Sequence, residues 1–233
     1  MRETRKNDKF SGKIIGRDFS DILYDGLLVD RAKISNTRFN NTHFKNSQLG
    51  RDSDYNNCEF VNCKFFGKYS TLGFSTRYTN CNFIDCDFVG VTLFEGSKFY
   101  KCNFSGVIKN AIIQDSRVGL FGAKTAVFND CDLRDVTFNN LSLYGSIGFN
   151  RCILPDKGLR KFRNDKDSLI QRAYDICSRV TSQDKIESEV IFKKDLKSGQ
   201  NPIILDDIFL SSFFTTSDSR NIFETIVQEF EIK

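Results

Sequence analysis

The chain has 233 residues, with 34 Lys and Arg against 30 Asp and Glu, so its formal net charge is +4. This small excess argues against the strongly basic footprint of a dedicated nucleic-acid-binding domain, and direct nucleic-acid binding is not expected. No apolar run approaches the roughly 18 residues that a membrane-spanning helix needs, and residues 1–9 are charged rather than apolar, so no signal peptide is visible. A cytoplasmic location is therefore expected.

A large apolar residue recurs every five residues through the first two-thirds of the chain, and a small residue lies two positions before it. This period matches neither the 3.6 of a helix nor the 2 of a strand, and such self-similarity must be settled before secondary structure is assigned. The register runs from about Ile14 with occasional one-residue insertions. Its large positions are Phe19, Tyr24, Val29, Ile34, Phe39, Phe44, Leu49, Tyr55, Phe60, Phe65, Tyr78, Phe83, Phe88, Leu93, Phe99, Phe104, Ile113, Val118, Phe128, Leu133, Phe138, Leu143, Phe149 and Leu154.

Units such as CNFSG at 102–106 and CDLRD at 131–135 resemble the pentapeptide-repeat proteins, whose loose consensus is small-polar-large-polar-polar. The resemblance covers about two-thirds of the chain and implies that four repeats make one square turn of a β-helix. The large and the small residue of each repeat then point into a narrow shaft, and stacked coils share one core. We therefore expect a mainly β fold, a right-handed quadrilateral β-helix solenoid over residues 1–154, followed by a separate C-terminal α-helical segment over residues 155–233.

Seven of the eight cysteines occupy the small inward position of this repeat, where a compact apolar side chain packs well. Counting four repeats per turn places Cys81 under Cys102, and Cys131 under Cys152, with Phe83 and Phe104 as large members of the same core ladder. Stacked neighbours would lie about 4.8 Å apart, within reach of a disulfide. Packing explains the placement, and reduced thiols are expected in a cytoplasmic protein. The spacing Cys-x4-Cys on successive walls is poor for zinc, so no metal site is expected.

The five-residue register is lost between Phe65 and Tyr78. A loop that projects from the rod over residues 66–77 is one interpretation, because exposed loops on rigid scaffolds often carry function. The candidate partner-binding residues in it are of types favoured at interfaces. They are Lys68, Tyr69, Phe74 and Arg77. The alternative is an irregular coil that tucks Leu72 and Phe74 into the shaft.

Beyond Pro155 the pattern changes, and apolar residues at spacings of three and four predict an amphipathic helix over residues 156–180. A second helix is predicted over residues 182–196, and an apolar stretch over 203–214 precedes a last helix that carries Phe223 and Ile226. This small helical bundle is expected to cap the open end of the solenoid, whose backbone edge would otherwise invite association. Partner docking, including a homodimer through these helices, is the alternative role.

The chain carries no nucleophile elbow, phosphate-binding loop, metalloprotease motif or dinucleotide-binding glycine pattern. The single histidine, His43, falls on an outward repeat position and is expected to be a solvated surface residue. The acidic pairs Asp85/Asp87 and Asp130/Asp132 resemble the paired carboxylates of glycosidases. Both pairs fall on polar wall positions of the repeat, so they are expected to be solvated. No catalytic residue, cofactor or small-molecule substrate is therefore expected.

A non-catalytic binding protein is the favoured function, with a protein partner engaged through a wall, the 66–77 segment or the C-terminal helices. The resemblance implies one alternative, because some pentapeptide-repeat proteins protect type II topoisomerases such as DNA gyrase by imitating the shape and charge of DNA. Such an imitator needs negative charge, whereas residues 1–154 hold 21 Lys and Arg against 16 Asp and Glu. A continuous negative wall would favour mimicry, and mixed or basic walls would count against it.

Overall fold

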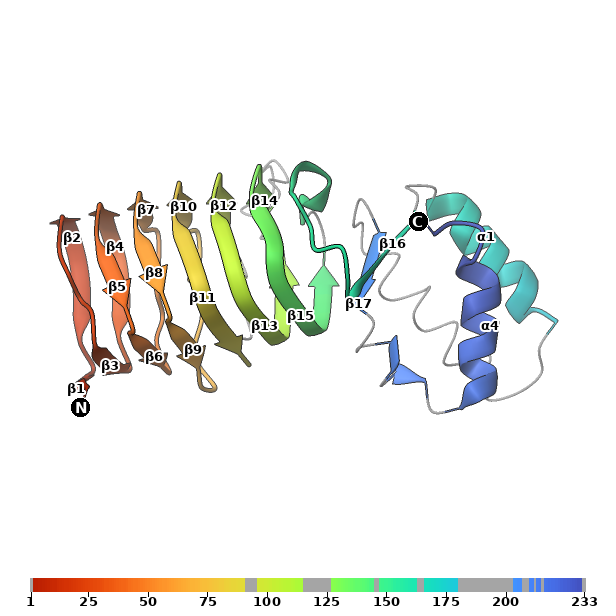
Figure 1. The fold of residues 1–233 in the computed structure, drawn as a ribbon, viewed down its shortest axis with the longest axis horizontal. Helices are drawn as coiled ribbons and strands as arrows, with labels where there is room; N and C mark the ends of the chain where they lie inside the picture. Colours follow the sequence, from red (N-terminus) through yellow and green to blue (C-terminus); the bar gives the residue numbers. More distant parts are fainter. Residues whose placement is uncertain are drawn as a thin grey trace.

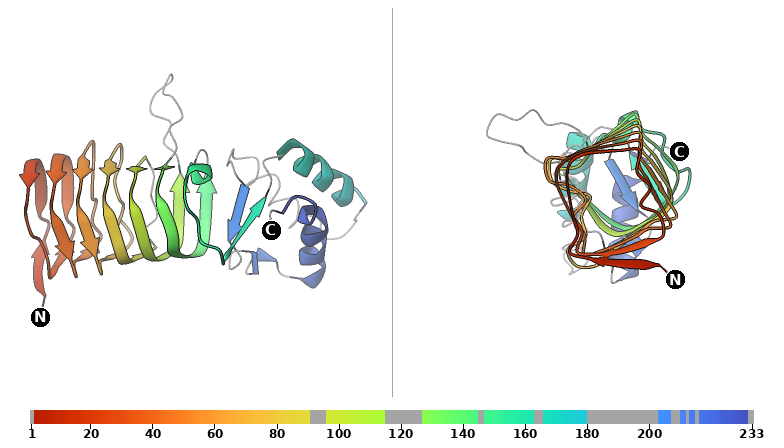
Figure 2. Two further views of the ribbon diagram at one scale, coloured as in Figure 1. Left: turned by 45° about the horizontal axis from the view of Figure 1, so that its top comes forward. Right: turned by 90° about the vertical axis from the view of Figure 1, so that its left-hand side faces the viewer.

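The computed structural model describes residues 2–90, 96–114, 127–144, 147–162, 166–179, 203–206, 210–211, 213–214 and 216–231. Short parallel strands stack into a four-sided rod, and helices α1 (Lys166–Cys177) and α4 (Ser217–Val227) lie beyond the end opposite the N-terminus (Figures 1 and 2). The predicted fold, a mainly β solenoid of stacked parallel coils followed by C-terminal helices, is confirmed.

Two parallel sheets supply the walls of the rod. The larger runs in the order β1 (Glu3–Lys6), β3 (Ile22–Asp25), β6 (His43–Lys45), β9 (Lys64–Phe66), β11 (Asn82–Val89), β13 (Asn103–Gln114) and β15 (Asp132–Tyr144), with β5 (Arg38–Asn40) and β8 (Glu59–Val61) paired beside this path. The smaller runs in the order β14 (Phe128–Asn129), β12 (Lys98–Tyr100), β10 (Arg77–Thr79), β7 (Asp54–Asn56), β4 (Leu28–Ser35) and β2 (Lys9–Ile15). A 3-10 turn, Phe149–Arg151, follows the last coil.

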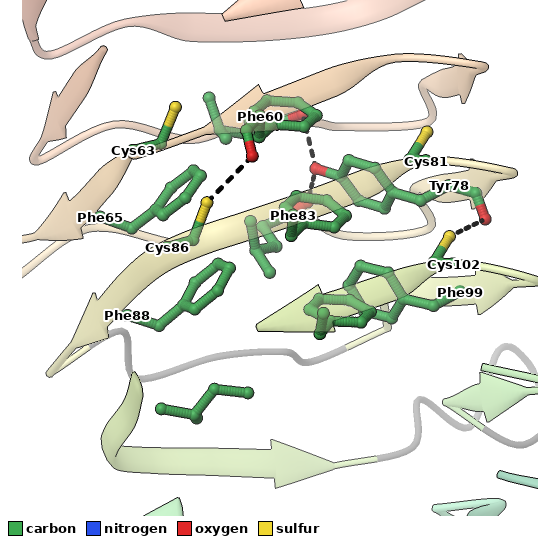
Figure 3. Close-up of a cluster of buried hydrophobic side chains, with 14 of the residues drawn as sticks. Phe60, Cys63, Phe65, Tyr78, Cys81, Phe83, Cys86, Phe88, Phe99 and Cys102 are labelled. Atoms are coloured by element: carbon green, nitrogen blue, oxygen red, sulfur yellow. Dashed lines mark hydrogen bonds between the residues drawn. The ribbon is translucent and has the colours of Figure 1, made fainter. Parts of the chain in front are cut away.

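The large residues of successive coils stack directly on one another inside the shaft (Figure 3). The rings of Phe60 and Phe83 lie 4.6 Å apart at 6°, and those of Phe83 and Phe104 lie 4.7 Å apart at 7°. Tyr55 and Tyr78 stack in the same way, at 4.6 Å. Their hydroxyl groups donate 2.7 Å and 2.8 Å hydrogen bonds to backbone carbonyls of the preceding segment, so the phenols are not left unsatisfied. Leu93 and Val118, also predicted for this core, lie outside the described residues.

The corners of the coils are built by residues with a positive φ, and asparagine is the commonest of those other than glycine. Asparagine tolerates the left-handed conformation because its short polar side chain can bond locally. Some corner amides also bond the corner one coil away, as Asn140 does to Asn110 at 2.8 Å. The polar corner position of the repeat is therefore a structural requirement of the square coil.

The solenoid begins earlier than the register in the sequence predicts. Strand β2 carries Phe10, which packs against the core, and strand β1 places Arg5 in register with Tyr24. In the sequence the large positions Phe104 and Ile113 are not spaced by five. The stretch between them is nevertheless regular, since it belongs to β13, with Ile108 buried above Phe88.

The C-terminal part differs from the predicted bundle at its start. Residues 156–180 do not form one helix, because Leu159–Phe162 is strand β16, which pairs antiparallel with β17 (Ile203–Asp206). Helix α1 begins only at Lys166. The predicted second helix, 182–196, lies outside the described residues. The last helix is α4, capped by Thr216, whose side chain accepts a hydrogen bond from the backbone N–H of Ser219. Neither helix of the described part is long and apolar enough to cross a membrane.

Candidate partner-binding surface

The 66–77 segment keeps the core register and bulges only at one corner. Leu72 is fully buried in the shaft. The small position before it is taken by Ser70, whose hydroxyl accepts from the backbone N–H of Ser47 on the coil below. Seven residues separate Phe65 from Leu72 where a regular repeat has five, and the extra length is absorbed at Gly67, where φ is 102°. Lys68 follows this turn on the outside of the rod.

The four residues predicted for partner binding are all exposed, and they are spread around the rod. Tyr69 is 63% exposed at the corner, with the Lys68 ammonium 5.5 Å from its ring centroid. Phe74 is 47% exposed and so is not tucked into the shaft, although its backbone bridges to Arg51 of the coil below. Arg77 lies on the next wall, in β10, 3.9 Å from Asp54. The structure thus combines the two interpretations of this segment, with a regular core and an outward aromatic pair.

Between Tyr69 and Phe74 every residue is buried. Gly73 has a φ of 109°, and a Cβ there would lie 2.3 Å from the carbonyl oxygen of Gly50. The backbone of the two coils therefore approaches too closely for any side chain at this position. Thr71, the other residue of the strip, is buried. Two exposed rings thus flank a strip of wall without large outward side chains.

The neighbouring wall, formed by β3, β6 and β9, holds a cluster of nitrogen-bearing side chains. The Arg2 guanidinium donates from Nε to the Asn41 carbonyl at 2.9 Å, and its Nη1 lies 3.1 Å from Nδ1 of His43. The His43 ring meets Phe66 edge-on at 6.2 Å, and the Lys64 ammonium lies 5.9 Å from the Phe66 centroid.

His43 is therefore only partly exposed, and the expectation of a fully solvated side chain is corrected. Desolvation, followed by the charges of Arg2 and Lys64, holds the pKa of this imidazole below its ordinary value of 6.5. No periodic signal could have linked Arg2 to His43, since 41 residues separate them.

The inward thiols form a longer column than the two predicted pairs. Cys58, Cys81, Cys102, Cys131 and Cys152 lie on successive coils, as the pairing of the residues next to them requires. All eight cysteines are free. Cys102 donates from Sγ to the Tyr78 carbonyl at 3.5 Å (Figure 3), and burial raises the pKa of its thiol. Across the described residues, no group of three or more His, Cys, Asp or Glu side chains could hold a metal ion.

The outward charges are mixed on the walls of the rod. On the wall of the smaller sheet, the position before each large residue carries Lys13, Lys33, Asp54, Arg77 and Lys98. On the wall of β5 and β8, Arg38 pairs with Glu59 at 3.1 Å, and further along Arg134 pairs with Asp132 at 2.8 Å. Neither of these two walls presents the continuous negative charge that a DNA mimic requires.

No protein-family model matches the chain, and no curated protein matches it. Eleven chains of solved structures do match. One is a trypsin-treated variant of QnrB1, a plasmid-mediated fluoroquinolone resistance protein, with 16% identity over 66% of this chain and 90% of that chain, at a TM-score of 0.26. At that similarity the match carries no inference about function. The five-residue register and the parallel four-walled solenoid that it builds are the features of this chain that fit the pentapeptide-repeat family.

Proposed function

We propose that this chain is a non-catalytic binding module that engages a protein partner through the aromatic pair Tyr69 and Phe74 and the adjoining Lys68. The observation that carries the proposal is the exposure of two large aromatic side chains on one coil of an otherwise well-packed rod. Tyrosine and other large aromatic residues dominate the binding energy of interfaces.

The backbone beneath this pair supports the proposal. The N–H of Thr71 donates to the Ser47 carbonyl at 3.0 Å, and the N–H of Phe74 donates to the Gly50 carbonyl at 2.9 Å. The segment that carries both rings is therefore held by the coil below before any partner arrives. A preorganised surface loses less conformational entropy on binding than a flexible loop does.

The alternative, inhibition or protection of DNA gyrase by DNA mimicry, is favoured less by the charges. Lys33, Arg77 and Lys98 lie along one wall, and a basic DNA-binding saddle would repel them. The presence of Asp54 between them does not make that wall acidic.

Residues 155–233 are best explained as a cap on the end of the solenoid. Leu159 packs in the solenoid core, whereas the apolar faces of α1 and α4 are buried against each other through Leu169 and Phe223. The helices therefore have less apolar surface to offer a second copy, and capping is favoured over a homodimer through them.

Photo-crosslinking tests the proposed surface. A benzophenone amino acid would replace Tyr69 or Phe74 in the full chain, and Ile153, which is 50% exposed at the C-terminal end of the rod, gives a matched control. We expect the same protein to be captured from bacterial lysate at positions 69 and 74 and not at 153. In the double variant Tyr69→Ser/Phe74→Ser, a benzophenone amino acid placed at position 68 in place of Lys68 should no longer capture that protein.

Equal capture at all three positions, or capture that survives the double variant, would contradict the proposal. A parallel supercoiling assay with purified DNA gyrase distinguishes this proposal from the alternative of DNA mimicry. Inhibition that persists in the double variant would favour mimicry through a wall.

A further inference from the structure

Arg2, His43 and Lys64 present hydrogen-bond donors side by side on the wall of β3, β6 and β9; we call these three residues the His43 cluster. Strand pairing places Leu23, His43 and Lys64 on successive coils, and Asp87 on the next one. Arg2 reaches the cluster from the chain just before β1, where its guanidinium is fixed by Asn41.

The contact between Arg2 and His43 fixes the tautomer of the imidazole. A guanidinium nitrogen has no lone pair to offer, so Nδ1 of His43 must accept the hydrogen bond from Nη1. The proton of the neutral ring then resides on Nε2. Protonation of Nδ1 would set two donors against each other, in agreement with the lowered pKa of His43.

Lys64 adds an ammonium group that is not neutralised. Within the described part of the chain, no carboxylate oxygen lies within 4.0 Å of its Nζ, whereas the next lysine on this wall, Lys45, is paired with Asp25 at 3.0 Å. Asp87 supplies the opposing charge, and it acts on His43 in the opposite sense to Arg2 and Lys64. The cluster thus offers two cations and a neutral N–H donor against one carboxylate.

We infer that the His43 cluster is an oxyanion-binding site that takes a carboxylate from an acidic segment of a protein partner. Two cations and one neutral N–H donor, opposed by a single carboxylate, are complementary to such a group. The site lies directly beside the proposed aromatic surface, because Lys64 and Phe66 share strand β9 and the chain turns from there to Lys68 and Tyr69. The inference rests on the proposed function and gives the partner its chemistry.

His43 is the only histidine of the chain, so its imidazole signals report on this site alone. The test is an NMR titration of the full chain with an N-acetylated penta-glutamate peptide, in which the His43 shifts and pKa are followed. We expect bound peptide to shift the Nε2 signal and to raise the pKa of His43, because a nearby anion favours the protonated form. Inorganic phosphate should give the same response if the free anion suffices.

Variants test whether the peptide binds at the His43 cluster. Lys64→Gln should weaken peptide binding about tenfold, the usual worth of one charge-assisted hydrogen bond. Asp87→Asn should strengthen it. Lys109→Gln is the matched control, because Lys109 is an exposed cation two coils further along the same wall, and it should change nothing.

The inference is overturned if His43 does not respond to the peptide, or if Lys64→Gln and Lys109→Gln weaken binding equally. It is also overturned if sodium chloride at matched ionic strength gives the same shifts, which would then report only screening. Failure here stays distinct from failure of the proposed function. If Lys64→Gln does not affect capture at positions 69 and 74, the proposed aromatic surface stands and the oxyanion site is contradicted.

Discussion

Leu159 and Phe162 lie three residues apart on strand β16 and belong to two different hydrophobic cores. Leu159 packs with the solenoid, and Phe162, which is fully buried, packs with α1 and α4. The strand also pairs with β17 on one side and, through Phe162, with Glu231 on the other. One short strand therefore closes the end of the rod and anchors the C-terminal part.

Phe162→Ala should loosen the C-terminal part and leave the rod intact. Removing this ring from its core costs about 3–5 kcal/mol, and its contacts lie on the helical side alone. Hydrogen exchange should become faster in α1 and α4 and stay unchanged in β5 to β12. Tyr174→Ala, at an exposed position of α1, is the control. Faster exchange throughout the rod would show that the two cores unfold together.

Arg160 ties this strand to the end of the chain. Its guanidinium makes bonds of 2.8 Å to Glu224 and 2.6 Å to Glu231, and it lies over the rings of Phe162 and Phe223. Both carboxylates hold the pKa of Arg160 above its ordinary value, with Glu231 the stronger cause. Arg160→Met should cost about 1–3 kcal/mol, a range reduced for the partial exposure of the two glutamates.

Arg160→Lys should recover less than half of that loss, because an ammonium cannot bond two carboxylates with a planar fork. The measurement is the urea midpoint of the helical signal. Arg172→Met, which removes a more exposed pair with Glu229, is the matched control. Full recovery by lysine would mean that charge alone, and not geometry, matters here.

The five-residue register predicted the fold through the resemblance to pentapeptide-repeat proteins that it carries, because each repeat has its own inward pair and the pattern of Phe83 recurs at Phe104. The exposure of Phe74 was not predictable. It depends on where the two extra residues after Phe65 are absorbed, and only the turn at Gly67 settles that. A local pattern therefore specifies the core but not the side of the rod on which an irregular residue projects.

Strand β16 shows that a local pattern in the sequence can also predict the wrong element. Leu159 and Phe162 are spaced as on one face of a helix, and the charged residues between them fit that interpretation. The segment forms a strand instead of a helix, because the two side chains pack in two different cores and the intervening backbone pairs with β17. The His43 cluster was not predicted from the sequence for a similar reason, since its members lie far apart in the sequence and meet only when neighbouring coils stack.

Asn80 tests the role of the corners. Its φ is 51°, and it is exposed. Alanine lacks the local polar contacts that make the left-handed region tolerable, so Asn80→Ala should destabilise the rod by about 1 kcal/mol. Asn80→Gly should be close to neutral, because glycine adopts this conformation freely. Equilibrium urea unfolding measures both variants, and equal losses for alanine and glycine would contradict the conformational explanation.

The lowered pKa of His43 predicts how stability depends on pH. The folded protein binds a proton on this ring less readily than the unfolded chain, whose value is near 6.5. The contribution of the neutral ring is therefore complete above that pH, and it is lost as the pH falls through the lower folded pKa. We expect the melting temperature to decline over this interval, and His43→Gln to flatten that part of the profile. Arg2→Gln should lessen the decline, because it removes a cation beside the ring. An unchanged slope in both variants would assign the decline to other groups.

The column of inward thiols predicts which substitutions the shaft tolerates and which thiol reacts first. Thr42 donates from its hydroxyl to the Phe19 carbonyl at 2.7 Å, from the same inward position at which Cys102 donates to Tyr78. A hydroxyl can therefore replace a thiol here with its hydrogen bond kept, and Cys102→Ser should cost no more than about 1 kcal/mol. Cys102→Leu should cost about 1–3 kcal/mol, because the shaft has no room for the longer side chain. Urea unfolding of both variants measures the difference, and equal losses would contradict the hydrogen-bond explanation.

Among the column's thiols, a soluble disulfide reagent should label Cys152 first, since it is half-buried while Cys58, Cys81, Cys102 and Cys131 are buried. Burial raises the pKa of the Cys102 thiol, and the contact with Cys131 followed by burial raises that of Cys152, so exposure and not the thiolate fraction sets the expected order. Labelling of the native chain followed by peptide mapping measures the order, and Cys152→Ser should remove the early phase alone. Early labelling of Cys102 would mean that the coils separate on the timescale of the reaction, which would contradict a rigid shaft and, with it, the preorganised backbone beneath Tyr69 and Phe74.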